Sequence, residues 1–316
     1  MFKVGIIGAG WIADKMAEAL SPLKDYCVYA IASRSIEKAE EFAQRWNVAK
    51  AYGSYEEMVD DKDVDLVYIA TPHSHHFPHT MLALEHGKHV LVEKAFTANA
   101  AEAEILIRTA HEKGLFITEA IWTRYMPLSH KVKEIMESGI IGEPRLLTAT
   151  LCYMMEFKER ILRPDLCGGA LLDLGVYALN FARMYFGTDI VKTVSNCQLG
   201  ETGMDMQECI SLCFADGKMA NLQAGNAFAQ LGDLTDILVA NNIRRIDVLL
   251  SPFVPVPDMN VCTADRCLAD LDQNFAGAGG GNGNLCQDHA LNSIGLDQCI
   301  HHSCHVYTSP IIKFRI

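Results

Sequence analysis

Short apolar runs alternate with amphipathic helical patterns through the first 120 residues, and this alternation limits the fold more than any other feature. The apolar runs cover residues 3–8, 27–33, 64–71, 89–94 and 115–120. Apolar strands separated by helices are typical of a doubly wound parallel sheet with helices on both faces. Such sheets bind ligands beyond the carboxyl ends of their strands, so we expect functional residues directly after the runs.

The turn after the first run has the pattern G-x-G-x-x-A, from Gly8 to Ala13. This pattern predicts a dinucleotide-binding turn, in which Gly8 permits the tight turn and Gly10 lets the backbone approach a pyrophosphate. Ala13 allows close packing of helix on strand, and Trp11 and Ile12 open a helix whose free N–H groups would hold the phosphates. The alternative is a purely structural glycine turn.

The end of the second run bears on the choice of cofactor. It contains Ser33 and Arg34, Lys38 follows one turn into the next helix, and no acid comes before Glu37. NAD-binding units usually place an acid here to hold the ribose 2′-hydroxyl, whereas a guanidinium beside hydroxyls suits a 2′-phosphate. We therefore predict NADP as the cofactor, with NAD as the alternative. The other interpretation is that Arg34 only decorates a surface turn.

Histidines gather in the loop after the third run. The loop begins with Thr71 and Pro72 and contains His73 and His76. We expect these four residues to lie over the nicotinamide end of the cofactor, where either histidine could hydrogen-bond it. A metal site is the alternative, but the loop has no carboxylate or cysteine, so we predict no metal.

The fourth run ends on an acid and a base, Glu93 and Lys94. That end should face the ligand crevice, so we expect both at the cofactor and Lys94 also in the chemistry, as a cation whose pKa is lowered by burial. An exposed ion pair is the alternative. Trp122, Arg124 and Tyr125, just past the fifth run, are predicted to form a wall of the substrate pocket; Arg124 could instead form a salt bridge between domains.

A double glycine at 168–169 precedes a long apolar pattern that predicts a helix to about Phe186, ended by Gly187. Asp173, Tyr177 and Asn180 have the spacing i, i+4 and i+7, so they form one polar stripe on this helix. Buried polar groups need partners, which makes these three residues candidates for the site. The alternative is a packing tyrosine whose hydroxyl is capped by Asp173.

Seven motifs follow one another over residues 1–228: GAGWIA, ASRSIEKAEEFA, ATPHSHH, HGKHVLVEKA, NAAEAEIL, EAIWTRYMP and GGALLDLGVYALN. In order and spacing they resemble those of the Gfo/Idh/MocA oxidoreductases, with most similarity to the dihydrodiol dehydrogenase and NADP-dependent D-xylose dehydrogenase branch. The resemblance implies an α/β fold: an N-terminal Rossmann domain (1–121) and a C-terminal α/β domain (122–316) built on a large, mostly antiparallel sheet that often pairs in a homodimer.

The same resemblance implies the chemistry, which is hydride transfer at a carbinol or hemiacetal carbon. It places Lys94 in the active site and makes Tyr177 the proton acceptor, assisted by Lys94, while Asp173 orients the substrate or the lysine. Asn180 would contact the substrate. The family motif is Glu-Lys-Pro, but this chain has Ala95 in place of the proline. We expect the Lys94–Ala95 bond to be trans, because a non-proline cis bond costs ~2.5–4 kcal/mol.

The last quarter of the chain differs in composition. Residues 229–316 contain no glutamate, one lysine and five of the eleven cysteines, together with the run GAGGGNGN at 277–284. Two hypotheses remain open, a divergent natural tail and a frameshift in the source gene; translation of the DNA in the other two frames would distinguish them. A frameshifted tail would leave the sheet without edge strands and weaken the homodimer.

The net charge of −12 argues against a nucleic-acid partner, and no run approaches ~18 apolar residues, so we expect no membrane span. Without a secretory signal, the cysteines indicate reduced thiols in the cytoplasm. We expect an NADP-dependent dehydrogenase of a small sugar or cyclic diol. The alternatives are a keto-sugar reductase and an NADP-binding sensor that has lost turnover. The sequence does not select the substrate.

Overall fold

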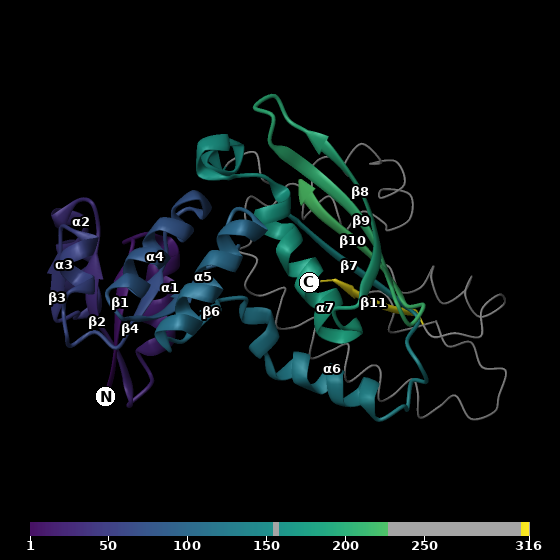
Figure 1. The fold of residues 1–316 in the computed structure, drawn as a ribbon, viewed down its shortest axis with the longest axis horizontal. Coiled ribbons are helices and arrows are strands. Elements are labelled where there is room, and N and C mark those ends of the chain that lie inside the picture. Colours follow the sequence, from purple (N-terminus) through teal and green to yellow (C-terminus); the bar gives the residue numbers. More distant parts are fainter. Residues whose placement is uncertain (154–157, 227–310, 316) are drawn as a thin grey trace, which may run out of the picture.

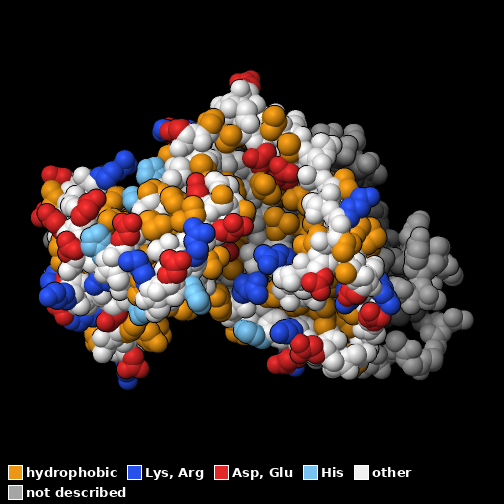
Figure 2. Space-filling model, viewed as in Figure 1, with side chains coloured by type: hydrophobic (Ala, Val, Ile, Leu, Met, Phe, Trp, Pro, Cys, Tyr) orange, Lys and Arg blue, Asp and Glu red, His pale blue; other side chains and the backbone are white. Residues whose placement is uncertain are grey.

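The computed structural model describes residues 1–153, 158–226 and 311–315. Two sheets with their own helices stand side by side along the longest axis, the N-terminal sheet in purple and blue and the second sheet in teal and green (Figure 1). The surface shows two lobes with a notch between them (Figure 2). No helix in the described ranges is long and apolar enough to cross a membrane.

The N-terminal sheet has six parallel strands in the order β3-β2-β1-β4-β5-β6. They are β1 (Phe2–Ile7), β2 (Tyr26–Ala32), β3 (Lys50–Tyr52), β4 (Leu66–Ile69), β5 (His89–Val92) and β6 (Ile117–Glu119). The expected parallel sheet is confirmed, and each of the five apolar runs overlaps one of these strands. No apolar run in the sequence predicts β3, which has only three residues and lies at the sheet edge. Chain order reverses at β1, between β2 and β4, which is where such sheets bind ligands.

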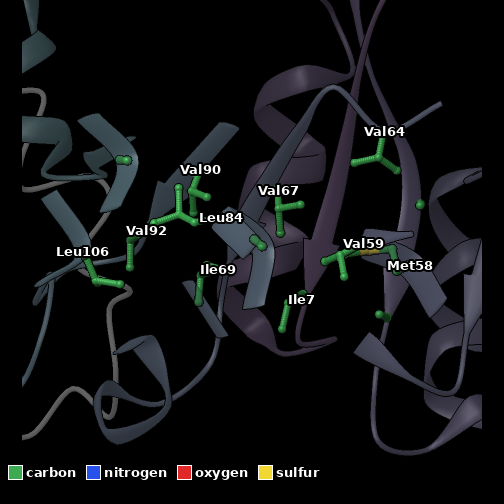
Figure 3. Close-up of a cluster of buried hydrophobic side chains, with 14 residues drawn as sticks. Ile7, Met58, Val59, Val64, Val67, Ile69, Leu84, Val90, Val92 and Leu106 are labelled. Carbon is green, nitrogen blue, oxygen red and sulfur yellow. The ribbon is translucent and has the colours of Figure 1, made fainter. Parts of the chain in front are cut away.

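Helices cover the N-terminal sheet and begin and end at ordinary signals. They are α1 (Trp11–Leu20), α2 (Ile36–Trp46), α3 (Tyr55–Val59), α4 (His76–Glu85) and α5 (Ala100–Lys113). The side chains of Ser35 and Asn99 accept hydrogen bonds from the first turns of α2 and α5, and Gly114 ends α5 at φ 65°. Helix and strand side chains such as Ile7, Leu84 and Val90 fill a core in which these residues are fully buried (Figure 3).

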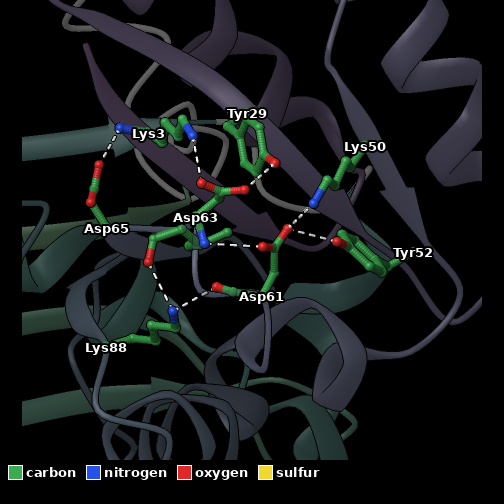
Figure 4. Close-up of polar contacts among 9 residues, drawn as sticks. Lys3, Tyr29, Lys50, Tyr52, Asp61, Asp63, Asp65 and Lys88 are labelled. Atoms are coloured by element: carbon green, nitrogen blue, oxygen red, sulfur yellow. Dashed lines mark hydrogen bonds and ion pairs between the residues drawn. The ribbon is translucent and has the colours of Figure 1, made fainter.

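A network of charged and polar side chains lies at the edge of this sheet that the amino ends of the strands form, away from the carboxyl ends. Asp61 accepts hydrogen bonds from Lys50 and Tyr52, and the buried Lys88 ammonium donates to the carbonyl oxygens of Asp61 and Val64 (Figure 4). These contacts hold the loop between α3 and β4 at the end of the sheet away from the ligand edge. The network therefore stabilises the fold and takes no part in the site described below.

The second sheet is mixed. Its order is β11-β7-β10-β9-β8, with β7 parallel to β10 and β11 and with β9 antiparallel to β8 and β10. The strands are β7 (Leu146–Tyr153), β8 (Ile190–Leu199), β9 (Asp205–Phe214), β10 (Met219–Asn226) and β11 (Ile311–Arg315). Gly217, at φ 85°, lies in the turn of the β9–β10 hairpin, and an Asp-Gly pair such as Asp216-Gly217 is typical of such turns. The hypotheses about residues 229–316 concern a segment that, apart from β11, lies outside the described residues.

Helix α7 (Val176–Phe186) lies across one face of the second sheet (Figure 1), where Ala178, Ala182 and Phe186 pack against β7 and β9. It ends at Gly187, as expected. A π-helical turn, η5 (Leu171–Gly175), precedes it. The remaining elements are α6 (Pro127–Glu137) and the 3₁₀ turns η1 (His73–His75), η2 (Trp122–Tyr125), η3 (Glu159–Leu162) and η4 (Pro164–Leu166). The path from η2 to α7 places residues of the second unit beside the carboxyl ends of β4, β5 and β6.

Candidate active site

Lys94 and Asp173 form a buried ion pair where the two units meet. The Lys94 ammonium donates to Asp173 Oδ1 at 2.8 Å and to the Asp173 carbonyl oxygen at 2.6 Å. Their side chains are only 14% and 3% exposed. Burial lowers the pKa of Lys94 against the pull of Asp173, and the neighbouring cations hold the pKa of Asp173 well below its usual range despite its burial. The pair is thus a carboxylate holding an ammonium whose proton is less tightly bound than that of an ordinary lysine.

A second cation shares the same carboxylate. Arg160, in η3, donates from Nη2 to Asp173 Oδ1 at 2.7 Å, so one oxygen atom accepts from both cations. Our sequence prediction did not include Arg160. In the sequence, Arg160 is simply a basic residue in the segment before the double glycine. Its spacing from Asp173 does not fit one face of a helix or strand, so the sequence does not indicate that the two side chains meet.

Tyr177 stands beside the lysine. The Lys94 nitrogen lies 5.2 Å from the centre of the Tyr177 ring. The Trp122 indole donates from Nε1 to the Tyr177 hydroxyl oxygen at 3.0 Å, and the two rings pack edge to face. Burial raises the pKa of Tyr177. The Tyr177 hydroxyl is therefore hydrogen-bonded to Trp122. The alternative interpretation of the sequence, in which Asp173 caps this hydroxyl, does not describe the observed contact.

Further polar groups extend this site toward the solvent. Arg124 donates from Nη1 to the Asn180 side-chain oxygen at 2.9 Å, which joins the predicted pocket wall to α7. Burial raises the pKa of Glu119 at the end of β6, although its carboxylate accepts the Phe96 N–H at 2.9 Å. Tyr125 is 63% exposed beside Arg124 and has room to contact a bound molecule. Glu119 is a second site residue that the sequence did not single out.

Glu93 faces the other side of the turn from Lys94. The buried Tyr68 hydroxyl, from β4, donates to Glu93 Oε1, and Glu93 Oε2 accepts the Lys94 backbone N–H at 3.2 Å. Burial raises the pKa of Glu93, and the Tyr68 hydrogen bond and Lys94 oppose this effect. Tyr68 and Glu93 together hold the backbone from which the lysine projects.

The expectation of a trans bond between Lys94 and Ala95 is wrong, because the structure has a cis bond there. Contacts on both sides define the turn without a proline. The Ala95 carbonyl oxygen lies 2.6 Å from His76 Nδ1, and the next N–H, of Phe96, is held by Glu119. Ala95 itself is 3% exposed, so packing also fixes this turn.

The two histidines predicted to reach the cofactor have different surroundings. His76 is fully buried, and its second ring nitrogen lies 2.8 Å from the Thr71 carbonyl oxygen, so neither nitrogen is left for a cofactor. His73 donates from Nδ1 to the Cys167 carbonyl oxygen at 2.9 Å, which leaves the Nε2 lone pair as an acceptor. Burial lowers the pKa of His73 to about 4, so this ring is neutral at physiological pH.

The turn from Gly8 to Ala13 suits a dinucleotide. Gly8 has φ +102°, and a Cβ there would lie 2.8 Å from the Ala70 carbonyl oxygen, so β1 and β4 approach closely only with glycine. Gly10 is the N-cap of α1 and is exposed with no atom within 4 Å of a Cβ position. No side chain caps the first N–H groups of α1, which remain available to phosphate oxygens. The residues present therefore fit the phosphates of a dinucleotide.

Family models match both units. Residues 2–120 match the model "Oxidoreductase family, NAD-binding Rossmann fold" and residues 129–237 match "GFO/IDH/MocA C-terminal domain". The chain is 39% identical over 216 residues to a trans-1,2-dihydrobenzene-1,2-diol dehydrogenase of Mus musculus (67% of this chain, 65% of the relative). It is 36% identical over 225 residues to the Xenopus tropicalis enzyme of that name (70% and 68%). The chain belongs to the Gfo/Idh/MocA oxidoreductase family.

Two further relatives extend the comparison. An NADP-dependent D-xylose 1-dehydrogenase of Hypocrea jecorina is 46% identical over 201 residues, which cover 57% of this chain and 51% of that enzyme. A 3-ketoreductase of Actinomadura kijaniata, solved with NADP and TDP-benzene, superposes with a TM-score of 0.66 at 30% identity over 71% of this chain and 70% of the other. The chain thus spans between half and two thirds of the first two curated relatives.

In this member of the Gfo/Idh/MocA family, the predicted catalytic residues Lys94, Asp173 and Tyr177 meet at one place. Trp122 joins them directly, whereas Arg124 and Asn180 pair with each other nearby. The predicted cofactor residues lie along the carboxyl edge of the N-terminal sheet, with exposed Trp11, Arg34, Lys38 and Pro72 and with half-buried Ile12, Ser33 and Thr71. Among the described residues there is no metal-binding group of three or more His, Cys, Asp or Glu.

Proposed function

We propose that this chain is an NADP-dependent dehydrogenase that transfers hydride between a carbinol carbon of a small sugar or cyclic diol and the nicotinamide. The observation that carries the proposal is the buried Lys94–Asp173 pair beside Tyr177, at the carboxyl end of β5. Removal of hydride from a C–OH carbon needs an acceptor for the hydroxyl proton and a cation beside the oxygen, and this group supplies both.

NADP is the cofactor that fits the residues at the end of β2. Arg34 and Lys38 are exposed there, and the acid of the segment, Glu37, accepts a hydrogen bond from the Ser35 hydroxyl at 2.6 Å. The guanidinium would hold a 2′-phosphate, and the first N–H groups of α1 would hold the pyrophosphate. The NADP dependence of the Hypocrea relative and the NADP bound to the ketoreductase support this choice.

The chain's own residues would handle the proton. NADP⁺, when bound, supplies the hydride acceptor. Lys94 has two of its three N–H groups on Asp173, so its third can reach the substrate oxygen. Oxidation would start from the neutral amine, which burial favours by lowering the pKa of Lys94. As Tyr177 takes the substrate hydroxyl proton, it would give its own phenol proton to the Lys94 lone pair, which forms the ammonium. In the reverse direction the same two groups would return the proton to a carbonyl oxygen.

The rim of the site favours a flat or ring-shaped polar substrate. Trp122 is 52% exposed although its indole N–H is fixed on Tyr177, so its free ring face can stack on a sugar or a cyclic diol. Arg124 and Asn180 offer hydrogen-bonding groups at the same mouth. These residues would bind hydroxyl groups next to the reacting carbon.

Steady-state formation of NADPH with a panel of aldoses and cyclic diols tests the proposal. Turnover with at least one of these classes, with NADP⁺ preferred to NAD⁺, is the expected result. Consumption of NADPH with keto-sugars but no oxidation of the alcohols would favour the reductase alternative. The structural similarity to the 3-ketoreductase supports this alternative. Sugar-dependent cofactor binding without turnover in either direction would favour the sensor alternative.

The proposal includes a cytoplasmic homodimer formed through the second sheet and a domain boundary at residues 121–122. Val191, Val194 and Leu199 of β8 are exposed large apolar side chains, and burial in a partner would stabilise them. Cys197 and Cys209 are exposed free thiols, as expected in a reducing compartment. Sedimentation velocity tests the dimer, cell fractionation tests the location, and limited proteolysis tests the boundary.

A further inference from the structure

Two cations compete for one oxygen atom in the site. Lys94 Nζ and Arg160 Nη2 donate to Asp173 Oδ1 at 2.8 and 2.7 Å. The carboxylate and the lysine are buried, whereas the Arg160 side chain is 43% exposed and comes from a segment that packs over the site. A guanidinium stays charged at any physiological pH, so the attraction between Arg160 and the Asp173 carboxylate does not change with pH. The attraction between Lys94 and Asp173, by contrast, depends on whether Lys94 is protonated.

The double glycine brings the arginine to the aspartate. A Cβ at Gly168 would lie 2.1 Å from the Ile161 carbonyl oxygen, so only glycine lets the two backbones approach this closely. The Gly169 N–H donates to the same carbonyl at 2.8 Å, and the Ile161 side chain is fully buried. These contacts fix η3 against the segment that leads into η5, and therefore fix Arg160, the neighbour of Ile161, beside Asp173.

We propose that Arg160 is a positioning residue for Lys94, which takes a share of Asp173 Oδ1 and so limits how tightly Asp173 holds the lysine and its proton. This role rests on the dehydrogenase function proposed above, in which Lys94 exchanges a proton. Without Arg160, Lys94 would be the one cation hydrogen-bonded to Asp173 Oδ1 among the described residues. The carboxylate would then stabilise the charged lysine more strongly, and the lysine would retain its proton at higher pH. The positive charge of Arg160 adds to the effect of burial, which lowers the pKa of Lys94, and Asp173 opposes both.

Several other titratable groups surround Lys94 and remain in place when only Arg160 is changed. Among the residues that the structure describes, the surrounding groups are Asp173, Glu93, Glu119, His73, His76 and Tyr177. The carboxylates favour the charged lysine. His73 is neutral at physiological pH, so Arg160 is the cation whose removal most directly changes the balance at Asp173.

The test compares Arg160→Met with Arg160→Lys in the full chain. Competitive acetylation of lysines with acetic anhydride over a pH series, followed by peptide mass spectrometry, gives the midpoint for Lys94 without any turnover. Exposed Lys133 of α6 provides an internal reference in the same sample. We expect the Lys94 midpoint to move to higher pH in Arg160→Met, while Arg160→Lys stays closer to the native value. Below the midpoint, each unit of that movement lowers the labelling rate about tenfold.

A second variant separates the position of the arginine from its charge. Gly168→Ala forces the Ile161 carbonyl away and displaces Arg160 while keeping it in the chain, so the Lys94 midpoint should move in the same direction as in Arg160→Met. Thermal unfolding and NADPH binding verify that each variant is folded. An unchanged or lower Lys94 midpoint in folded Arg160→Met overturns the proposal, as does an equal movement in Arg160→Lys and Arg160→Met.

Activity provides the independent readout. In the alcohol-oxidising direction, the acidic limb of the kcat/KM profile should move to higher pH in Arg160→Met together with the labelling midpoint. A moved midpoint in a protein whose native form has no turnover would support the role of Arg160 and contradict the dehydrogenase proposal. The two proposals can thus fail separately.

Discussion

The indole of Trp122 donates its N–H to the hydroxyl oxygen of Tyr177 at 3.0 Å, across 55 residues of sequence. This hydrogen bond occupies one lone pair of the phenol and fixes its orientation. It leaves the second lone pair to accept the substrate proton and the phenol's own proton free for transfer toward Lys94. Trp122 thereby joins the pocket wall to the proposed proton acceptor.

Replacement of Tyr177 by phenylalanine should remove most turnover while NADP⁺ binding stays nearly intact. The expected loss in kcat is about 10²–10³-fold, since the substrate hydroxyl then has no positioned acceptor. Stopped-flow measurement of NADPH formation gives kcat, and quenching of tryptophan fluorescence gives the cofactor Kd. The matched control is Tyr185→Phe on the same helix, whose hydroxyl donates to the Ser129 carbonyl oxygen and which should keep its activity. Retained activity in Tyr177→Phe would refute the assignment of Tyr177.

Replacement of Arg34 by leucine should weaken NADP⁺ binding about 10- to 100-fold and leave NAD⁺ binding nearly unchanged. A hydrogen bond to a charged group contributes about 1.5–3 kcal/mol, and only NADP⁺ carries the 2′-phosphate. Titration by fluorescence quenching with each cofactor measures both constants. Arg108→Leu, an exposed arginine on α5, is the control and should change neither. Equal weakening of both cofactors would remove the support for NADP selectivity.

The glycines of the first turn should respond differently to alanine. Gly8→Ala should lower the free energy of unfolding by about 1–3 kcal/mol, because φ is +102° there and the new Cβ would lie 2.8 Å from the Ala70 carbonyl oxygen. Gly10→Ala should leave stability almost unchanged, because φ is −99° and its surroundings are open. Gly10→Ala should nevertheless weaken cofactor binding, since a Cβ there occupies space that the pyrophosphate needs. Urea unfolding and cofactor titration of both variants test this contrast; normal NADP⁺ affinity in Gly10→Ala would contradict the phosphate site.

Stability should fall as the pH drops from about 6.5 toward 4, in part because of His73. Its pKa is lowered from 6.5 to about 4 in the folded protein, so in this window the unfolded chain binds a proton that the native chain does not. The contribution of His73 to the free energy of unfolding is therefore fully present above pH 6.5 and is lost as the pH falls toward 4. For this one ring it amounts to about 2 kcal/mol between pH 7.5 and 5.0.

Urea unfolding of the native chain and of His73→Gln at the two pH values measures this contribution. The variant keeps a side-chain donor for the Cys167 carbonyl oxygen but cannot titrate, so its stability should change less between pH 7.5 and 5.0. Equal changes in the two proteins would show that His73 is as easily protonated in the fold as in the unfolded chain.

Local signals predicted much of the fold because they act within a few residues. The strands β1, β2, β4, β5 and β6 overlap the five apolar runs, and Gly187 ends α7 where the apolar pattern stops. β3 escaped prediction because three residues at a sheet edge carry too little periodicity. The π-helical turn at Leu171–Gly175 was also not foreseen, because the 3.6-residue period of the pattern continues through it.

The site was predictable in its residue types but not in its contacts. The residues that follow the strands of a doubly wound sheet must share one edge, which brought Lys94 to the crevice in the prediction. By contrast, the partners Arg160, Tyr68 and Glu119 depend on how distant segments pack, and no local spacing encodes that. Residue type alone predicts a trans Lys94–Ala95 bond, whereas His76 and the packing of Ala95 define the turn in the structure.

Lys94 and Asp173, separated by 79 residues, belong to different halves of the molecule, and this division has a consequence for inheritance. Burial lowers the pKa of this lysine, which is encoded in the first half, and a carboxylate and a guanidinium encoded in the second half modify that pKa. If recombination exchanged the second half for that of a relative, the pKa of Lys94 would change although no codon of the nucleotide-binding sequence had changed. New pH optima can therefore arise in such a chain by recombination, while cofactor recognition is inherited intact.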